Sequence, residues 1–376
     1  MPVLRDLAVS QYFATVEDPR IDRTKDHALL DIIIITLCAV ICGAESWVAV
    51  EEFGTTKRAW LETFLDLPHG IPSHDTFGRV FARIDPQQFQ HSFMQWVRAL
   101  QQVRGDLIAI DGKTHRGTHD RPNGKAALHL VSAWAAENRL VLGQVAVDDK
   151  SNEITAIPIL LDLLDLEGCT VTIDAMGCQT EIADQIVQRG GNYVLALKGN
   201  QPTLYDDVQA LFADARAAQQ AEYGITSATE TVMGHGRVET RTAYVISDPA
   251  VIAYLNEGQR WRDLASVALI EAQRTVNGTT TIEQRYYLLN QRLAAATVND
   301  LVRTHWGIEN QVHWVLDVVF HEDASRIRNG HAPQNMAVIR HMALNLLRQE
   351  PSKGSLKSKR FRAALDGAYL ARVLGC

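Results

Sequence analysis

Three acidic residues far apart along the chain are the strongest candidates for chemistry. Asp111 ends the apolar run LIAI, Asp174 ends the run TVTI, and Glu309 lies in a predicted helix. If the two apolar runs are neighbouring strands of one sheet, both aspartates emerge at the same edge. Carboxylate oxygens held by strand ends and a helix suit a hard divalent cation. The three residues therefore predict a site for two magnesium ions, about 4 Å apart, that assists phosphoryl transfer.

Each of the three acids also has a purely structural interpretation. An aspartate at a strand end often caps a turn, and the Asp-Gly dipeptide at residues 111–112 favours that role. Glu309 taken alone would be a surface residue of a helix. The joint layout of all three acids, rather than any one of them, is what indicates a metal site.

Other side chains near Glu309 offer competing sites. His305 and His313 flank it at four-residue spacing on one helix face, where zinc could bind. No second cluster completes that site, and the acid next to the histidine in a His-Glu-x-x-His arrangement is absent. Three further acids follow in the sequence, namely Asp317, Glu322 and Asp323. Glu322 lies roughly four helical turns beyond Glu309, too far to share its metal ions if the helix continues.

Basic and aromatic side chains near the three acids are candidates for contacts with nucleic acid. Those that follow the first aspartate are Lys113, His115 and Arg116, and Lys198 ends the predicted strand YVLALKGN. Those on the predicted helix around the glutamate are Arg303, His305, Trp306 and His313. Such side chains contact phosphates or stack on bases. A solvated loop or ordinary core packing explains each of them equally well when it is taken alone.

The elements that position these residues can be predicted from periodicity. The first hundred residues show apolar and aromatic residues at helical spacing. From residue 106 the order is three strands, helix, strand, helix, strand, which predicts a mixed sheet with helices packed on it. Alternating runs between about residues 219 and 290, with an Asn277-Gly278 turn signal, predict hairpins. From Ala294 onward the pattern is helical again, so the predicted fold class is α/β with a mixed sheet.

Bulk composition places limits on the class of protein. The chain has 376 residues, 46% of them hydrophobic and 22% charged, as in an ordinary soluble globular protein. Its net charge of -7 argues against a protein that coats nucleic acid by charge alone, although residues 349–376 form a basic tail or a solvated helical face. The apolar run from Leu29 to Ala44 is short for a membrane span, and no secretory signal precedes it. We therefore expect a cytoplasmic protein with no membrane partner.

Five separated motifs carry a resemblance to a known family. They are IPSHDTFGRVF, AIDGKTHRGT, TIDAMGCQ, YVLALKGNQPTL and HWGIENQVHWVLDVVFHEDASRIR. In this order they closely resemble the H-repeat-associated, insertion-sequence type of DDE transposase, and the similarity runs from about Phe13 through Arg348. The resemblance implies a helical associated domain at residues 1–100 and an RNase H-like catalytic domain at 101–348, with a β-rich insertion at about 219–290. It also implies that Asp111, Asp174 and Glu309 are the DDE triad and bind two magnesium or manganese ions.

The implied reaction is metal-dependent cleavage of DNA followed by strand transfer. Water attacks a phosphodiester at the end of the element, and the freed 3′-hydroxyl then attacks target DNA by the same in-line displacement. The implied partners are double-stranded DNA, as terminal inverted repeats and target, and a second copy of the chain in a homodimer on DNA. The broader group carries an arginine four residues before its glutamate and a lysine seven after it. Here those positions are His305 and Leu316, and Arg303 lies six before.

Two other functions stay open at this point. A transposase-derived protein that binds DNA without turnover would keep the same motifs, but the intact Asp, Asp, Glu set disfavours it. A metal-free hydrolase with paired carboxylates, such as a glycosidase, would place an acid and a base on either side of a sugar. The sequence near Asp111 and Asp174 lacks the aromatic platforms that would hold that sugar.

Overall fold

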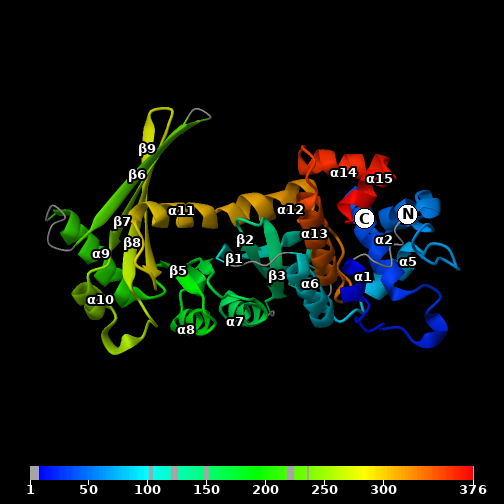
Figure 1. Ribbon diagram of the computed structural model, residues 1–376, viewed down its shortest axis with the longest axis horizontal. Coiled ribbons are helices and arrows are strands. Elements are labelled where there is room, and N and C mark those ends of the chain that lie inside the picture. Colours follow the sequence, from blue (N-terminus) through cyan, green and yellow to red (C-terminus); the bar gives the residue numbers. More distant parts are fainter. Residues whose placement is uncertain are drawn as a thin grey trace.

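The computed structural model describes residues 8–100, 105–119, 126–147, 152–217, 224–234 and 237–375. Within these ranges one mixed sheet has nine strands in the order β3-β2-β1-β4-β5-β9-β8-β7-β6. The strands are β1 (Leu107–His115), β2 (Leu128–Ala135), β3 (Leu140–Ala146), β4 (Thr170–Ile173), β5 (Asn192–Leu197), β6 (Thr226–Gly234), β7 (Arg237–Ile246), β8 (Ser266–Val276) and β9 (Thr279–Leu289). Figure 1 shows the sheet reaching from the middle of the molecule to one end, with a helical region at the other. This confirms the predicted mixed sheet and helical N-terminal region.

The described part of the first hundred residues is helical. Its helices are α1 (Ala8–Phe13), α2 (Leu29–Cys42), α3 (Trp47–Thr56), α4 (Arg58–Leu61), α5 (His74–Phe81) and α6 (Pro86–Leu100). Helix α2 is buried on nearly all sides, because α13 (Ala332–Gln349) and α14 (Leu356–Leu365) pack on it beside its neighbour α3. In the described ranges no single helix is long and apolar enough to cross a membrane. Helices α2 and α3 together reach that length and apolarity, but the chain bends by 95° between them.

The point at which β4 ends beside β1 positions the two aspartates. Residues Leu107–Ile110 of β1 are all buried, as expected of a central strand. Strand β1 is parallel to β4, and β4 is parallel to β5. Ile110 pairs with Ile173, so the residues that follow them, Asp111 and Asp174, emerge side by side. Strand β1 continues beyond Asp111 as far as His115, opposite β2, so the Asp-Gly dipeptide is not a turn.

Strands β6 to β9 extend the same sheet as antiparallel hairpins. Strand β9 joins the core by pairing with β5, with Val194 opposite Leu289. Asn277 and Gly278 connect β8 to β9 with φ angles of 49° and 81°, the left-handed conformations of a two-residue hairpin turn. The predicted hairpins are therefore present, and they continue the central sheet rather than forming a separate one.

Helices cover both faces of the sheet. Helix α11 (Ala295–His305) contacts β1, β4, β6 and β7, whereas α7 (Glu153–Leu163) and α8 (Thr180–Gln188) pack on β2, β3 and β5. Figure 1 shows α11 and α12 (Trp314–Val319) as one long rod that crosses from the hairpins towards the N-terminal helices. Helices α7 and α8 lie below it in that view, on the opposite side of the sheet. The remaining helices are α9 (Pro202–Ala217), α10 (Pro249–Leu255) and α15 (Gly367–Val373). The rod carries Glu309 across the edge where the aspartates emerge.

Candidate active site

The three acids predicted from the sequence line one cavity of ≈ 160 Å³. Asp111 and Asp174 reach it from the adjacent strands β1 and β4, and Glu309 reaches it from the rod. Glu309 begins a π-helical segment, Glu309–His313, between α11 and α12. A π-helical turn holds an extra residue and often marks a functional site, because it changes which side chains share a face. The sequence predicts one continuous helix there and gives no sign of this turn.

Asp174 combines the structural role with its position in the cavity. Its Oδ1 accepts hydrogen bonds from Met176 N at 3.0 Å and Gly177 N at 3.4 Å, and so caps a short 3-10 helix, Ala175–Gly177. Asp111 Oδ1 accepts from Gly112 N at 2.9 Å. The cap fixes the Asp174 side chain at the end of β4, so the turn-capping role does not exclude its position in the cavity.

Burial and mutual repulsion make the two aspartates hard to ionise. Burial, together with the charges of Asp174, Glu309 and Glu153, raises the pKa of Asp111 to about 7. Burial and Glu153 likewise raise the pKa of Asp174, although Lys198 nearby opposes the rise. Carboxylates held close together in this way gain from a cation that neutralises them.

Glu153 is a fourth carboxylate that the sequence analysis missed. It is the first residue of α7, and its Oε1 lies 2.8 Å from His129 Nε2 of β2. A Cβ on Gly112 would lie 2.1 Å from Glu153 Oε1, so the glycine leaves room for this carboxylate where it lies in this structure. The sole sequence signal is a glutamate after a capping asparagine, which is common at helix starts.

The donor chemistry of the triad fits a hard divalent cation, since all its ligand atoms are carboxylate oxygens. The side chains converge without meeting, however. Across the ranges that the structure describes, no three His, Cys, Asp or Glu side chains stand close enough to hold one metal ion. Coordination therefore requires the side chains to move closer together than they are in this structure.

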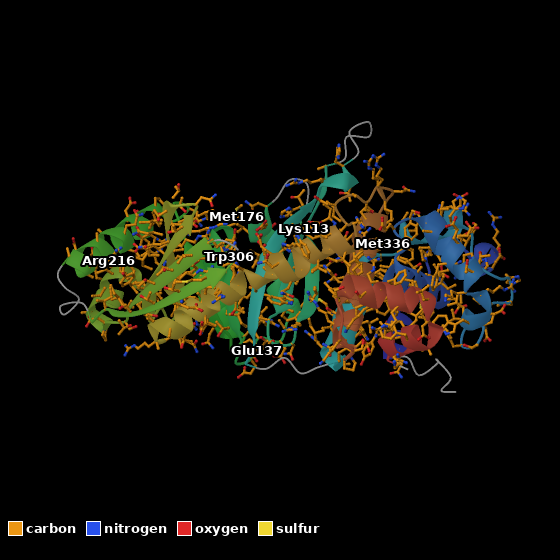
Figure 2. The ribbon with its side chains drawn as sticks, turned by 90° about the horizontal axis from the view of Figure 1, so that it is seen from above. Lys113, Glu137, Met176, Arg216, Trp306 and Met336 are labelled. Carbon is orange, nitrogen blue, oxygen red and sulfur yellow. The ribbon has the colours of Figure 1, made fainter. Side chains whose placement is uncertain are left out.

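Several predicted DNA-contact residues border this cavity. Lys198, His305 and Trp306 line it. His305 is half-buried, and its Nδ1 lies 2.9 Å from Thr172 Oγ1. Burial lowers the pKa of His305 to about 4, so the ring is neutral near pH 7. Figure 2 shows Trp306 on the hairpin side of Lys113.

The other predicted DNA-contact residues next to Asp111 lie away from the cavity. The side chain of Lys113 is 11% exposed and His115 is buried, and both approach Glu322. The side chain of Arg116 is 86% exposed. His313 Nδ1 lies 3.5 Å from Asp111 Oδ2, and its Nε2 has no protein hydrogen-bond partner among the described residues. Of this group, only Arg116 has its charged side chain available to a phosphate in this structure.

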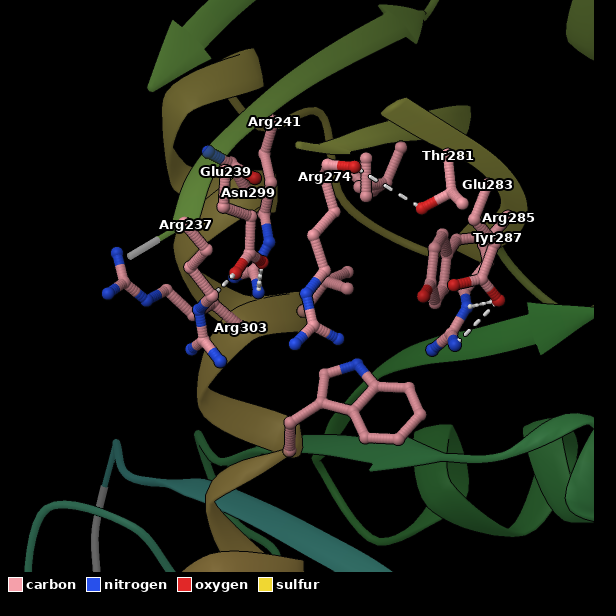
Figure 3. A pocket seen from close by; sticks show the side chains of 14 residues that line it. Arg237, Glu239, Arg241, Arg274, Thr281, Glu283, Arg285, Tyr287, Asn299 and Arg303 are labelled. Carbon is pink, nitrogen blue, oxygen red and sulfur yellow. Dashed lines mark hydrogen bonds and ion pairs between the residues drawn. The ribbon is translucent and has the colours of Figure 1, made fainter. Parts of the chain in front are cut away.

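An arginine-rich groove adjoins the cavity. The groove measures ≈ 360 Å³, and its arginines, shown in Figure 3, are Arg237, Arg241, Arg274, Arg285 and Arg303. Its acidic lining residues are Glu239 and Glu283. Arg285 stacks 4.2 Å above the ring of Trp306, and both residues line the groove and the cavity. The groove therefore leads from the hairpins to the three acids.

The sequence analysis found only Arg303 and Trp306 in this groove. Arg303 comes from α11, where its Nη1 lies 2.6 Å from Glu230 Oε1 of β6. The remaining arginines come from three different strands, β7, β8 and β9. They share a face of the sheet only because of the register in which these strands pair. The sequence feature that could have revealed part of the groove is the alternation of charged residues along one strand, at Arg237, Glu239 and Arg241.

Comparison with known proteins places these features in a family. Residues 10–97 match the family described as DDE_Tnp_1-associated, and residues 104–346 match the family described as Transposase DDE domain. "Putative transposase YncI" of Escherichia coli O157:H7 is 40% identical over 96% of this chain and 93% of its own length. "H repeat-associated putative transposase YhhI" of Escherichia coli K12 is 38% identical over 97% of each chain. A solved piggyBac transposase synaptic complex with hairpin DNA matches with a TM-score of 0.42 and 10% identity. The match covers 98% of this chain and 78% of the piggyBac chain. A TM-score this low does not establish a shared fold.

Proposed function

This chain belongs to the family of transposases with a DDE domain, and from that premise we propose that Asp111, Asp174 and Glu309 act together in DNA cleavage and strand transfer. The observation that carries the proposal is that all three line one cavity, although two come from strands and one from a helix. The succession of three strands, helix, strand, helix and strand supports an RNase H-like core for residues 101–348. When bound, two Mg²⁺ or Mn²⁺ ions would activate the attacking oxygen and stabilise the leaving oxygen.

The protein's own groups prepare this site for a cation and a phosphate. The pairing of β1 with β4 holds the backbones of Asp111 and Asp174 side by side, and the rod supplies Glu309 to the same cavity. Asp111 must lose its proton before it binds a cation, because its pKa lies near 7. Lys198 contributes a positive charge next to Asp174, where the phosphodiester would enter.

The arginine-rich groove supports DNA as the partner. One arginine guanidinium group can bind two oxygens of a phosphate at once, and a row of arginines can bind successive phosphates of a nucleic-acid backbone. The groove shares Arg285 and Trp306 with the cavity, so a strand lying in it would bring a phosphodiester to the three acids. Two copies of the chain would bring together the two ends of the element, as the resemblance implies.

Cleavage of end-containing DNA tests this proposal. Purified protein with Mg²⁺ should nick a DNA fragment that carries the element's inverted repeats. The variants Asp111→Ala, Asp174→Ala and Glu309→Ala should each lower the nicking rate about a hundredfold or more. Asp300→Ala, which removes an exposed acid from α11, is the matched control and should cut like the wild type. Equal cutting by the triad variants would refute the assignment, and wild-type binding without cutting would instead favour a DNA-binding protein without turnover.

A further inference from the structure

A buried ionic cluster lies beside the candidate active site and has no role in the proposed chemistry. Glu322, in the loop after α12, is 0% exposed. Its Oε2 lies 3.0 Å from Lys113 Nζ and 3.5 Å from His115 Nε2, and its Oε1 lies 3.7 Å from Arg340 Nη1. Lys113 Nζ also lies 2.6 Å from Asp317 Oδ1. These five residues are the Glu322 cluster.

The cluster joins the two elements that carry Asp111 and Glu309. Side chains alternate along a strand, so Lys113 lies on the same face of β1 as Asp111. Asp317 belongs to α12, and Lys113 Nζ lies 3.5 Å from His313 O, the last residue of the π-helical segment that Glu309 begins. The strand of one acid is thus tied to the helix of another through one lysine.

The loop that carries Glu322 is held firmly against the same strand. Arg116 N donates to Asp323 Oδ1 at 3.0 Å, and Arg328 Nε donates to Gly117 O at 2.9 Å. A Cβ on Gly117 would lie 2.4 Å from Ser325 O, so the two backbones pack at a distance that only glycine allows. The motifs DGKTHRG and HEDASRIR are therefore two halves of one contact.

The charges in the cluster balance. Lys113 and Arg340 are the cations, and Asp317 and Glu322 are the anions, because burial keeps His115 neutral by lowering its pKa. Burial would raise the pKa of Glu322, but His115, Lys113 and Arg340 each favour its ionised form and together hold that pKa well below its usual range. Buried ion pairs add little net stability compared with apolar packing, and their best-attested role is to specify one arrangement.

We propose that Glu322 is a positioning residue that, through Lys113, locks the π-helical turn in the register that directs Glu309 towards Asp111 and Asp174. This inference rests on the proposed function, because it takes Glu309 to be a ligand of the site. Glu322 itself stays buried and touches neither DNA nor the cation. Without its charge, Lys113 loses one of its two carboxylate partners, and the tie that Lys113 makes between β1 and the π-helical turn weakens.

The test is a double-mutant cycle read out by Mn²⁺ binding to the DNA-free protein, followed by electron paramagnetic resonance. Glu322→Gln should weaken Mn²⁺ binding about tenfold, and Glu309→Gln should weaken it at least as much. If Glu322 acts through Glu309, the combined variant should bind no more weakly than Glu309→Gln alone. Asp323→Asn, which alters the adjacent acid but not Lys113, should bind Mn²⁺ like the wild type.

The outcomes separate the two proposals. If the two losses of Mn²⁺ affinity multiply in the combined variant, the positioning role is wrong but the metal assignment stands. The same holds if a folded Glu322→Gln protein binds Mn²⁺ like the wild type. No effect of Glu309→Gln would overturn the metal assignment and this inference with it. Should Glu322→Gln not fold, Lys113→Met with Glu322→Gln removes one charge of each sign and keeps the balance. That variant should fold and still bind Mn²⁺ about tenfold more weakly, and wild-type affinity in it would contradict the proposal.

Discussion

At the scale of single residues, the stretch Asp111-Gly112-Lys113 shows how adjacent positions of one strand serve different neighbours. Asp111 faces the cavity, and Lys113 enters the Glu322 cluster on the same face of β1. Gly112, between them, leaves room for Glu153. A carboxylate flanked by other carboxylates and shielded from water is costly to ionise, so under the proposed function a cation would replace the proton of Asp111.

The raised pKa of Asp111 predicts how stability depends on pH. The carboxyl ionises near its ordinary value of 3.8 in the unfolded chain but near 7 in the folded protein. Between these two pH values the folded protein therefore keeps the Asp111 proton that the unfolded chain has lost. The free energy of unfolding of the metal-free protein falls as pH rises from about 4 to 7, by on the order of 4 kcal/mol at most. Urea unfolding in a chelator should show Asp111→Asn close to wild type at pH 4 and several kcal/mol more stable at pH 8. The same difference at both pH values would contradict the assigned pKa.

At the scale of elements, the register between β1 and β4 and the course of the rod create the site. The pairing of Ile110 with Ile173 places two aspartates together, and the π-helical turn presents Glu309 to them. The hairpins β6 to β9 then add the arginine-rich groove to the same sheet. The proposed catalytic acids and the arginines proposed to bind DNA are thus attached to one continuous sheet.

The groove predicts a specific dependence of DNA binding on salt. Each arginine that neutralises a phosphate adds about -0.9 to the slope of log K against log salt concentration. Arg241→Gln and Arg274→Gln should each make the slope shallower by about 1 and weaken binding to all sequences alike. Arg260→Gln, on the exposed surface of a loop outside the groove, is the control and should leave the slope unchanged. An unaltered slope in both groove variants would exclude this groove as the path of the DNA backbone.

The sequence predicts the helices and strands better than it predicts the contacts between them. Apolar runs identified the strands that hold Asp111 and Asp174, and the resemblance supplied Glu309, because these features are local in sequence. Lys113 could not be assigned to the Glu322 cluster, since its partners lie some 200 residues away and meet it only after folding. The arginines of the groove were missed for the same reason: the pairing of β7 with β8 decides which of them share a face.

At the scale of the whole molecule, the end of the chain ties its distant parts together. Arg360 of α14 donates to Val40 O at 2.9 Å, to Ile41 O at 3.4 Å and to Val319 O. These carbonyls lie at the C-terminal ends of α2 and α12, one in the N-terminal helical region and one in the rod. At least part of the positive charge predicted for residues 349–376 therefore joins helices instead of facing solvent.

This junction predicts a large effect of a single substitution. Arg360→Met would leave three carbonyls without their donor, at about 1 kcal/mol each, and should lower the thermal midpoint by several degrees. Lys357→Met, an exposed lysine of the same helix, should leave the midpoint unchanged. Differential scanning calorimetry makes the comparison. Equal midpoints for the two variants would show that α14 does not hold the helical region to the rod.

The central claim is that Asp111, Asp174 and Glu309 together hold the divalent cations, and anomalous diffraction tests it most directly. Crystals of the protein with Mn²⁺ and end-containing DNA should show anomalous peaks between the three carboxylates, with the oxygens drawn to about 2.2 Å from the ion. Glu309→Gln should weaken or abolish these peaks. Manganese bound elsewhere, or bound by the two aspartates with Glu309 turned away, would contradict it.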